Sequence, residues 1–333
     1  MVRFLVVRFS SIGDIILTTP VMRHLKQEVK DAEVHFLTKS TFSALLEANP
    51  YVDRIHTLNG NLQACIRELR ALQIDYIIDL HNNARSARLK YGLKRMDFAV
   101  NKLNWKKWLL VNLKLDHLPD KHMVDRNLDT ISNFISRRDE QGLDYFIPEE
   151  AEVDPASLPE TFQHGYIGLS IGAQHETKKL PLPLLIELCR KLRYPILILG
   201  GPTDRVTGDA LVSALPAQSI RNTCGLYTLH QSASLVKQAR VLISHDTGLM
   251  HMGAAFHKKI ISVWGNTVPK FGMYPYRAHP SSRQFEVEGL PCRPCSKIGF
   301  QKCPKKHFKC MMDQDLEGMA ETAHRLFRET TGQ

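Results

Sequence analysis

Short apolar runs alternate with longer amphipathic segments in the first quarter of the chain. The apolar, β-branched runs predict strands at residues 3–8, 34–37, 54–58 and 76–80. Apolar positions spaced about 3.6 residues apart predict helices at residues 15–29, 41–48 and 62–72. Pro20 lies inside the first of these segments, so that helix is either kinked or begins later. Strands separated by helices favour a parallel sheet with crossover connections.

The same alternation returns after residues 147–164, a polar, acidic stretch with three prolines that is the best linker candidate. Strands are predicted at residues 166–171, 195–199, 219–221, 241–244 and 260–264. Helices are predicted at residues 182–192, 209–215, 229–239 and 249–256, and a last one at 315–328. The pattern predicts an α/β protein with domains at 1–155 and 156–312. Residues 313–333 would form a C-terminal helix that packs back towards the N-terminal domain.

Composition narrows the class of protein without choosing a partner. The chain has 333 residues, of which 43% are hydrophobic and 23% charged, which excludes disordered, collagen-like and coiled-coil proteins. A net charge of +10 favours an acidic partner: phosphates, nucleic acid or an anionic membrane surface. The sequence has no apolar run of about 18 residues that would span a membrane. It begins with a strand-like segment rather than a signal peptide, so we expect a cytoplasmic protein.

A basic stretch interrupts the alternation at residues 84–114, where nine Lys and Arg side chains face one acid, Asp97. Within it, residues 104–110 mix tryptophan, lysine and leucine. One interpretation is a solvated basic helix whose aromatic rings pack on the domain. The other is a surface that meets an acidic amphiphile or the inner face of the cytoplasmic membrane.

The loop that follows the first predicted strand is the first candidate for chemistry. In an open α/β sheet the ligand binds beyond the carboxyl ends of the strands, so the loop Ser10–Asp14 would lie beside it. Gly13 keeps this loop small, and Asp14 would project towards the ligand or simply cap a helix. The loop matches neither a dinucleotide fingerprint nor a P-loop, which argues against those two classes.

Three further loops follow predicted strands in the second half. Asp246, Thr247 and Gly248 precede a helix whose free N–H groups suit a diphosphate, and His251 lies one turn later. A second loop, at residues 172–181, carries Gln174, Lys178 and Lys179, and these lysines either neutralise phosphate charge or are only solvated. Gly200, in the third loop, would shape a nucleoside pocket.

Four cysteines cluster near the C-terminus. Cys292, Cys295, Cys303 and Cys310 lie among lysines, which would lower their pKa values and favour thiolates. Four thiolates can form a structural zinc site, with His307 as an alternative ligand. An iron–sulfur cluster, a disulfide pair and free thiols stay open. Asp313 and Asp315 superficially match the metal-binding pair of some sugar transferases, but they open a helix and are interpreted as capping acids.

Together these segments resemble the heptosyltransferases, glycosyltransferase family 9. The resemblance rests on SSIGDIILTTP, GAQHETKKLP, LGGPTD, HDTGLMHMGAAF and VWGNTVP, which occur in the family's order. It implies a GT-B fold, with two Rossmann-like domains facing a central cleft. It also implies inverting, metal-independent transfer of heptose, or a related sugar, from an ADP-sugar to a lipopolysaccharide-core or other acidic envelope glycolipid.

The resemblance also assigns roles to residues. Asp14 would be the general base, and Ser10, Ser11 and Gly13 would lie on the acceptor side. The donor would be held by residues of the second half: Gln174, Lys178, Lys179, Gly200, Asp246, Thr247, Gly248 and His251. Leu180 replaces a tryptophan that is frequent in the family, and Gly253 an alanine. The alternatives are a sugar-nucleotide epimerase, and a basic nucleic-acid-binding or non-enzymatic nucleotide-binding protein. No nucleic-acid-binding module is recognised, so no nucleic-acid partner is expected.

Overall fold

A computed structural model describes residues 1–329 of the chain. The chain forms two compact units. Unit 1 comprises Met1–Leu103 and Lys121–Pro148. Unit 2 comprises Asn104–Asp120 and the chain from Glu149 onward. The boundary predicted from the sequence, between residues 155 and 156, lies close to the last of the three points at which the chain passes from one unit to the other. The sequence gives no sign that residues 104–120 group with unit 2.

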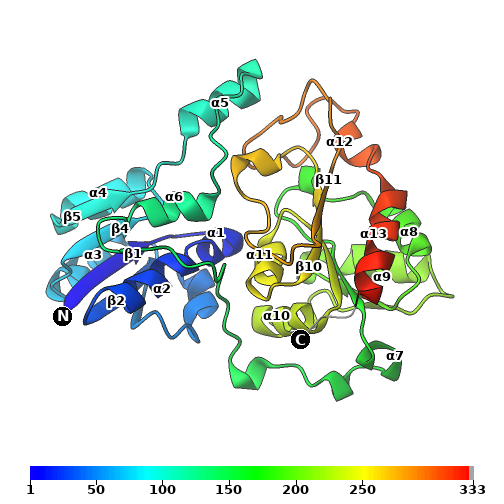
Figure 1. The fold of residues 1–333 in the computed structure, drawn as a ribbon, viewed down its shortest axis with the longest axis horizontal. Coiled ribbons are helices and arrows are strands. Elements are labelled where there is room, and N and C mark those ends of the chain that lie inside the picture. The colour runs from blue at the N-terminus through cyan, green and yellow to red at the C-terminus, as the bar shows by residue number, and fades with distance from the viewer. Residues whose placement is uncertain (330–333) are drawn as a thin grey trace. The chain divides into compact units, whose positions relative to one another are not determined.

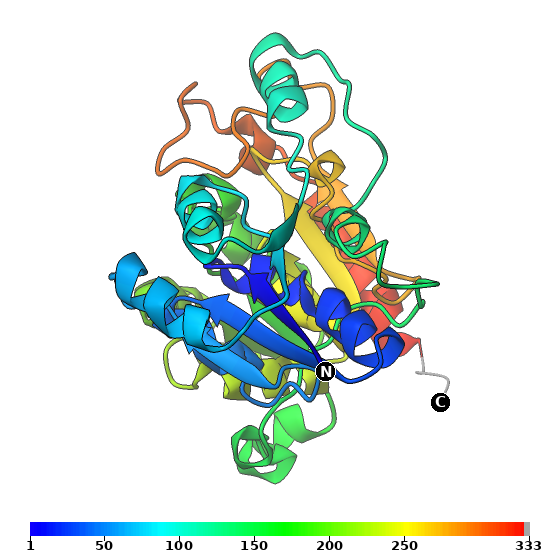
Figure 2. The ribbon, with the colours of Figure 1, turned by 90° about the vertical axis from the view of Figure 1, so that its left-hand side faces the viewer.

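Unit 1 is a parallel sheet with helices, as its alternating pattern predicts (Figure 1). Its strands are β1 (Val2–Val7), β2 (Ala32–Thr38), β3 (Arg54–Thr57), β4 (Tyr76–Asp79) and β5 (Met96–Ala99). Its helices are α1 (Ile12–Ile16), α2 (Thr19–Glu28), α3 (Leu62–Ala71), α4 (Ala84–Leu93) and α6 (Met123–Asp129), with a 3₁₀ turn, η1, at Ser40–Leu46. The strand order is β3-β2-β1-β4-β5, and all neighbouring strands are parallel. The strands of this unit are coloured blue to cyan in Figure 2.

The central strand β1 organises the core of unit 1. Phe4 to Val7 are fully buried, because β1 has a neighbour on both edges and packs on both faces. The predicted long first helix is two helices, α1 and α2, and α2 begins at Thr19 with Pro20 in its first turn. Proline is tolerated there because that N–H has no partner within the helix. The helix predicted at residues 41–48 is the 3₁₀ turn η1.

Unit 2 contains a second parallel sheet of strand order β11-β10-β9-β6-β7-β8. The strands are β6 (Ile167–Ser170), β7 (Ile196–Leu199), β8 (Ile220–Asn222), β9 (Val241–His245), β10 (Lys259–Trp264) and β11 (Arg283–Glu286). The helices are α5 (Asn104–Leu113), α7 (Glu160–Gln163), α8 (Leu182–Lys191), α9 (Arg205–Ser213), α10 (Leu229–Gln238), α11 (Gly248–Ala255), α12 (Lys309–Met312) and α13 (Leu316–Arg328). The 3₁₀ turns are η2 (Glu149–Ala151), η3 (Pro155–Ser157), η4 (Glu176–Lys178), η5 (Pro202–Asp204) and η6 (Pro269–Phe271).

The last helix, α13, packs within unit 2. It contacts α8, β9 and β10, and its buried residues Met319, Ala323 and Leu326 belong to the core of that unit. Asp315 caps α13 by accepting a hydrogen bond from the Gly318 N–H at 2.8 Å. The interpretation of this acid as a helix cap is therefore confirmed.

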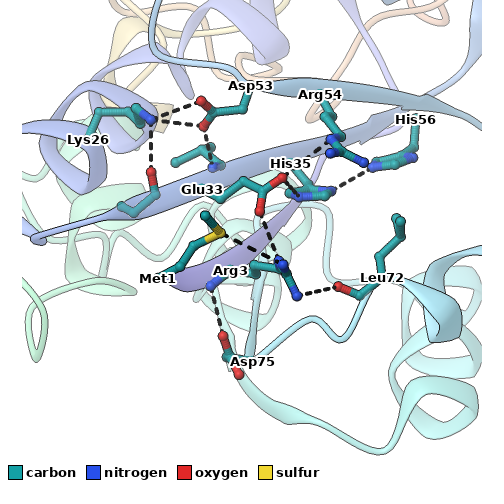
Figure 3. A network of polar contacts seen from close by, with 12 residues as sticks. Met1, Arg3, Lys26, Glu33, His35, Asp53, Arg54, His56, Leu72 and Asp75 are labelled. Atoms are coloured by element: carbon teal, nitrogen blue, oxygen red, sulfur yellow. Dashed lines mark hydrogen bonds and ion pairs between the residues drawn. The ribbon is translucent and has the colours of Figure 1, made fainter.

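A polar network lies at the amino ends of the strands in unit 1 (Figure 3). Arg3 on β1 pairs with Glu33 on β2 at 2.8 Å, and His35 and His56 share a hydrogen bond of 2.8 Å. Burial lowers the pKa of His56 to about 4, so this ring is neutral at pH 7. The network lies at the end of the sheet opposite the loop that carries Ser10–Asp14. None of the described helices is long and apolar enough to cross a membrane.

Candidate active site

The carboxylate of Asp14 lies in the loop that leaves the central strand of unit 1. Ser11, the N-cap of α1, donates to Asp14 Oδ2 through its hydroxyl at 2.9 Å and its N–H at 3.3 Å. Asp14 therefore sits at the third helical position of a capping box and is not the N-cap itself. Its side chain is 25% exposed, so Asp14 is not sealed from solvent.

Arg8 completes this arrangement and was not identified from the sequence. Its guanidinium contacts Asp14 Oδ1 at 2.6 Å and donates to the carbonyl oxygens of Ser10 and Leu80 at 2.8 Å and 2.6 Å. Arg8 thus ties together the loops after β1 and β4, where the strand order reverses and where open α/β sheets bind ligands. Burial would raise the pKa of Asp14, but Arg8 and the Ser11 hydrogen bonds outweigh it and lower that pKa to about 2. The carboxylate is ionised at neutral pH.

A cavity of about 660 Å³ opens at the same point of unit 1. Ser10 lines it, as do basic residues that the sequence did not single out. The lining residues are Phe9, Ser10, Lys39, Gly60, Leu62, His81, Asn83, Ala84, Arg85 and Arg88. They come from loops that leave four strands and from the start of α4, so no single stretch of sequence contains them. Their one sequence signal is that each loop follows a predicted strand.

The corresponding reversal of strand order in unit 2 lies between β6 and β9. Lys178, from the loop after β6, contacts Asp246 Oδ2 at 2.5 Å in the loop after β9. Thr267 donates to the same carboxylate oxygen at 3.2 Å. The side chains of Lys178 and Asp246 are 16% and 10% exposed, so the pair is largely shielded from water. The structure brings these two predicted residues together and adds Thr267, which follows β10.

The N-terminus of α11 lies directly beside this pair. Thr247 is its N-cap, but the Thr247 side chain makes no capping hydrogen bond and contacts Ser244 Oγ at 3.3 Å instead. The first N–H groups of α11, from Gly248 onward, therefore have no side-chain cap. His251, one turn later, is buried. A helix start of this kind suits a phosphate group.

Lys179 and Gly200 belong to a neighbouring cluster around Asp204. Lys179 contacts Asp204 at 3.2 Å and Glu176 at 2.8 Å, so two carboxylates compensate its charge. A Cβ atom at Gly200 would lie 2.8 Å from Cys224 Sγ, so close packing requires glycine there. Gln174, also predicted to bind substrate, accepts a hydrogen bond from Gln301 through its backbone oxygen at 3.4 Å.

A family model decides the class of this protein. The model of glycosyltransferase family 9 (heptosyltransferase) matches residues 62–305. The chain belongs to this family. It is therefore a glycosyltransferase, as the sequence motifs predict.

Individual relatives and solved structures agree with the family. The chain is 23% identical to lipooligosaccharide heptosyltransferase 2 of Campylobacter jejuni, with 96% of both chains covered. It is 24% identical to lipopolysaccharide heptosyltransferase 1 of Campylobacter coli, over 79% of this chain and 83% of that protein. Its fold is similar to that of a family 9 glycosyltransferase from Veillonella parvula, with a TM-score of 0.79, 20% identity and 98% of both chains covered. The Escherichia coli heptosyltransferase WaaC with ADP gives a TM-score of 0.68 at 19% identity, covering 97% of this chain and 99% of that one. The GT-B architecture expected from the sequence is confirmed.

The cysteine cluster of this glycosyltransferase does not support the predicted zinc site. Among the described residues, no group of three or more His, Cys, Asp or Glu side chains is arranged to hold a metal ion. The Cys295 thiol donates to the Cys292 carbonyl oxygen at 3.0 Å. Burial raises the pKa of Cys295 to about 11 and that of Cys310 to about 12, opposite to the lowering expected from nearby lysines. Spacing in the sequence does not show this burial.

The two tryptophans of α5 do not pack into the core. Trp105 and Trp108 are 68% and 42% exposed, and their rings stack on each other with centroids 5.1 Å apart. Leu110 is the buried residue of this helix. Trp105 is therefore mostly open to solvent, and Trp108 is partly covered.

Proposed function

We propose that this glycosyltransferase transfers heptose from ADP-heptose to a lipopolysaccharide-core acceptor, with inversion at the anomeric carbon. The relatives named above are lipopolysaccharide and lipooligosaccharide heptosyltransferases, which supports this choice of donor and acceptor. The observation that carries the proposal is the ionised Asp14 carboxylate at the end of the central strand of unit 1. No other described acid lies in the loops at that reversal of strand order except the fully buried Asp79, at the end of β4.

In the proposed reaction, an acceptor hydroxyl oxygen attacks the anomeric carbon of the donor. The bond between that carbon and the diphosphate oxygen breaks, and its electron pair leaves with ADP. The hydroxyl proton passes to Asp14, which acts as general base. Ser11 and Arg8 keep the Asp14 carboxylate in one orientation through three contacts.

The low pKa of Asp14 determines when the proton moves. A carboxylate with a pKa of about 2 does not deprotonate a free sugar hydroxyl. The hydroxyl becomes a strong acid only as its oxygen bonds to the anomeric carbon, so proton transfer accompanies or follows that bond. Asp14 then accepts a proton late in the step.

Unit 2 would stabilise the departing diphosphate. Lys178 and the first N–H groups of α11 supply positive potential where negative charge develops on the leaving group. In this proposal they replace a catalytic metal ion, and no nucleic acid takes part. Asp246 and Thr267 hold Lys178 in position.

We place the reaction at the cytoplasmic face of the inner membrane, where a glycolipid acceptor would be anchored. The exposed Trp105 and Trp108, with Lys106 between them, support contact of α5 with an anionic lipid surface.

The experiment is to compare Asp14→Asn with wild type, using ADP-heptose and lipopolysaccharide from a heptose-deficient strain. Loss of the base lowers kcat by about 10²–10⁴-fold, whereas ADP affinity stays within about twofold. Asp31→Asn is the matched control, because Asp31 is exposed and has a positive φ of 55° that asparagine tolerates. Turnover of Asp14→Asn at the wild-type rate would remove Asp14 as the base.

A further inference from the structure

The cavity of unit 1 collects positive charge without any acid. Its basic lining residues are Lys39, Arg85 and Arg88, and no Asp or Glu lines it. Lys39 follows β2, while Arg85 and Arg88 lie on the first two turns of α4. The cavity therefore gathers three cations from the loop after β2 and from α4.

These cations have no ionic partner within the part of the chain that the structure describes. Some other basic residues of unit 1 have such a partner: Arg23 pairs with Asp139, Lys26 with Asp53 and Lys90 with Asp97. For Arg85 the structure gives a ring contact, with its guanidinium carbon 5.8 Å from the centre of the Phe9 ring. Like charges gathered around a cavity repel one another, and a bound anion relieves that repulsion.

Two other polar groups around the cavity, Asn83 and His81, are less suited to bind an anion than these three cations. Asn83 Oδ1 already accepts the N–H groups of Arg85 and Ser86 at 3.0 Å and 2.9 Å, so the start of α4 is capped. His81 lines the cavity as a neutral ring, because burial and the nearby Arg8 and Lys102 charges lower its pKa to about 4. Guanidinium groups bind carboxylate and phosphate oxygens in pairs, which makes Arg85 and Arg88 the main candidates.

We infer that this cavity holds an anionic group of the sugar acceptor, a carboxylate or a phosphate, through Arg85, Arg88 and Lys39. The inference rests on the proposed function and specifies its acceptor as a charged glycolipid. Ser10 connects the cavity with the base, because it lines the cavity and immediately precedes Ser11, which donates to Asp14. An acceptor anchored by its anion would present a neighbouring hydroxyl on the side of Asp14.

The first test measures kinetic constants of Arg85→Gln, Arg88→Gln and the double variant, with ADP-heptose and heptose-deficient lipopolysaccharide. Each charged hydrogen bond lost corresponds to about a tenfold rise in the acceptor KM, and the double variant to about a hundredfold. The donor KM stays within about twofold. Arg67→Gln is the matched control, since Arg67 is an exposed arginine of α3 that does not line the cavity. An unchanged acceptor KM in the double variant, or an equal rise in donor KM, would overturn the inference.

The second test identifies the anion by using two modified acceptors. One has its phosphates removed, and the other has its carboxylates converted to methyl esters. The acceptor that lacks the bound group has a raised KM with wild type, and its KM is the same with wild type and with the double variant. Either arm giving this result supports the inference and names the anion. If both modified acceptors behave like the intact one, the cavity does not bind an anion of the acceptor.

Equilibrium binding separates this inference from the proposed reaction. If wild type transfers no heptose, the proposed function fails, but heptose-deficient lipopolysaccharide can still be titrated into the protein by calorimetry. Binding to wild type and to Arg67→Gln, with at least about tenfold weaker binding to the double variant, would support the cavity as an anion site on its own. Equal binding to all three proteins, or no binding to any, would overturn it.

Discussion

The candidate sites of the two units are built alike but carry charge differently. In each unit the loops at the reversal of strand order hold a carboxylate and a cation in contact, Asp14 with Arg8 and Asp246 with Lys178. In unit 2 the next cation, Lys179, is compensated by two acids. In unit 1 the cavity adds three cations with no acid. Unit 1 is therefore prepared for a charged partner whose anion supplies the missing negative charge.

The same pair also serves opposite purposes in the two units. In the proposed reaction the carboxylate of unit 1 is the reacting group, and Arg8 holds it ionised and oriented. In the same proposal the lysine of unit 2 meets the substrate, and Asp246, which accepts a hydrogen bond from Thr267, orients that lysine. In this proposal, equivalent positions at the ends of central strands hold a base in unit 1 and an electrostatic stabiliser in unit 2.

After Asp14→Asn, the largest expected effect is on Lys178→Met, which removes the proposed stabilising cation of unit 2. Loss of one preorganised group opposite developing charge lowers kcat by about 10²–10³-fold. Lys178→Arg keeps the charge and should recover part of the rate. Steady-state kinetics with ADP-heptose measures both variants. A kcat of Lys178→Met equal to that of wild type would show that Lys178 does not stabilise the leaving group.

A second prediction concerns the neutral histidine in each half, His81 in unit 1 and His245 in unit 2. Burial lowers the pKa of His245 to about 3 and that of His81 to about 4. As the pH falls, these two histidines are protonated in the unfolded chain first, near pH 6.5, while they stay neutral in the folded protein. The free energy of unfolding therefore has its full value above pH 6.5 and falls as the pH drops towards 4. Each ring contributes at most about 3 kcal/mol to this loss.

The variant that tests this is His81→Gln, measured by urea unfolding between pH 7 and pH 4. The variant should lose less stability across this range than wild type, because it lacks one of the protons taken up on unfolding. His117→Gln is the control, since His117 is exposed. A pH dependence identical to that of wild type would show that His81 is not held neutral by the fold.

The smallest expected effect is on Lys179→Met. Because Asp204 and Glu176 already compensate Lys179, its removal should lower kcat by less than about tenfold, or about 1.4 kcal/mol. The ratio of kcat between Lys179→Met and Lys178→Met measures how strongly charge compensation by neighbouring carboxylates reduces the effect of a lysine. Equal losses in the two variants would show that the local carboxylates do not set the roles of these lysines.

The sequence singles out those candidate residues that follow a strand directly. Asp14, Lys178 and Asp246 were identified because each lies in a short loop after an apolar run. The sequence does not single out Arg8 or Thr267. Arg8 donates to the Leu80 carbonyl oxygen and Thr267 to the Asp246 carboxylate, and both partners are distant in the sequence. The sequence does not predict the cavity, because Lys39 and Arg88 line it together only when β2 and β4 lie on either side of β1 in the sheet.

The fold shows the same limit. The strands with buried, β-branched runs were predicted closely, whereas β5 and α4 were not. Met96 and Asp97 on the edge strand β5 are exposed, so their pattern carries no burial signal. The zinc prediction was not supported for a related reason, because the spacing of Cys292 and Cys295 does not reveal how each thiol is buried.

Calorimetric titration of ADP tests most directly the claim that unit 2 holds the donor and unit 1 the acceptor. It would compare wild type, Lys178→Met and the Arg85→Gln/Arg88→Gln double variant. The account predicts that ADP binds wild type and the double variant with affinities within about twofold, and binds Lys178→Met about tenfold more weakly. Equal weakening in the double variant, or full ADP affinity in Lys178→Met, would contradict the division of roles between the two units.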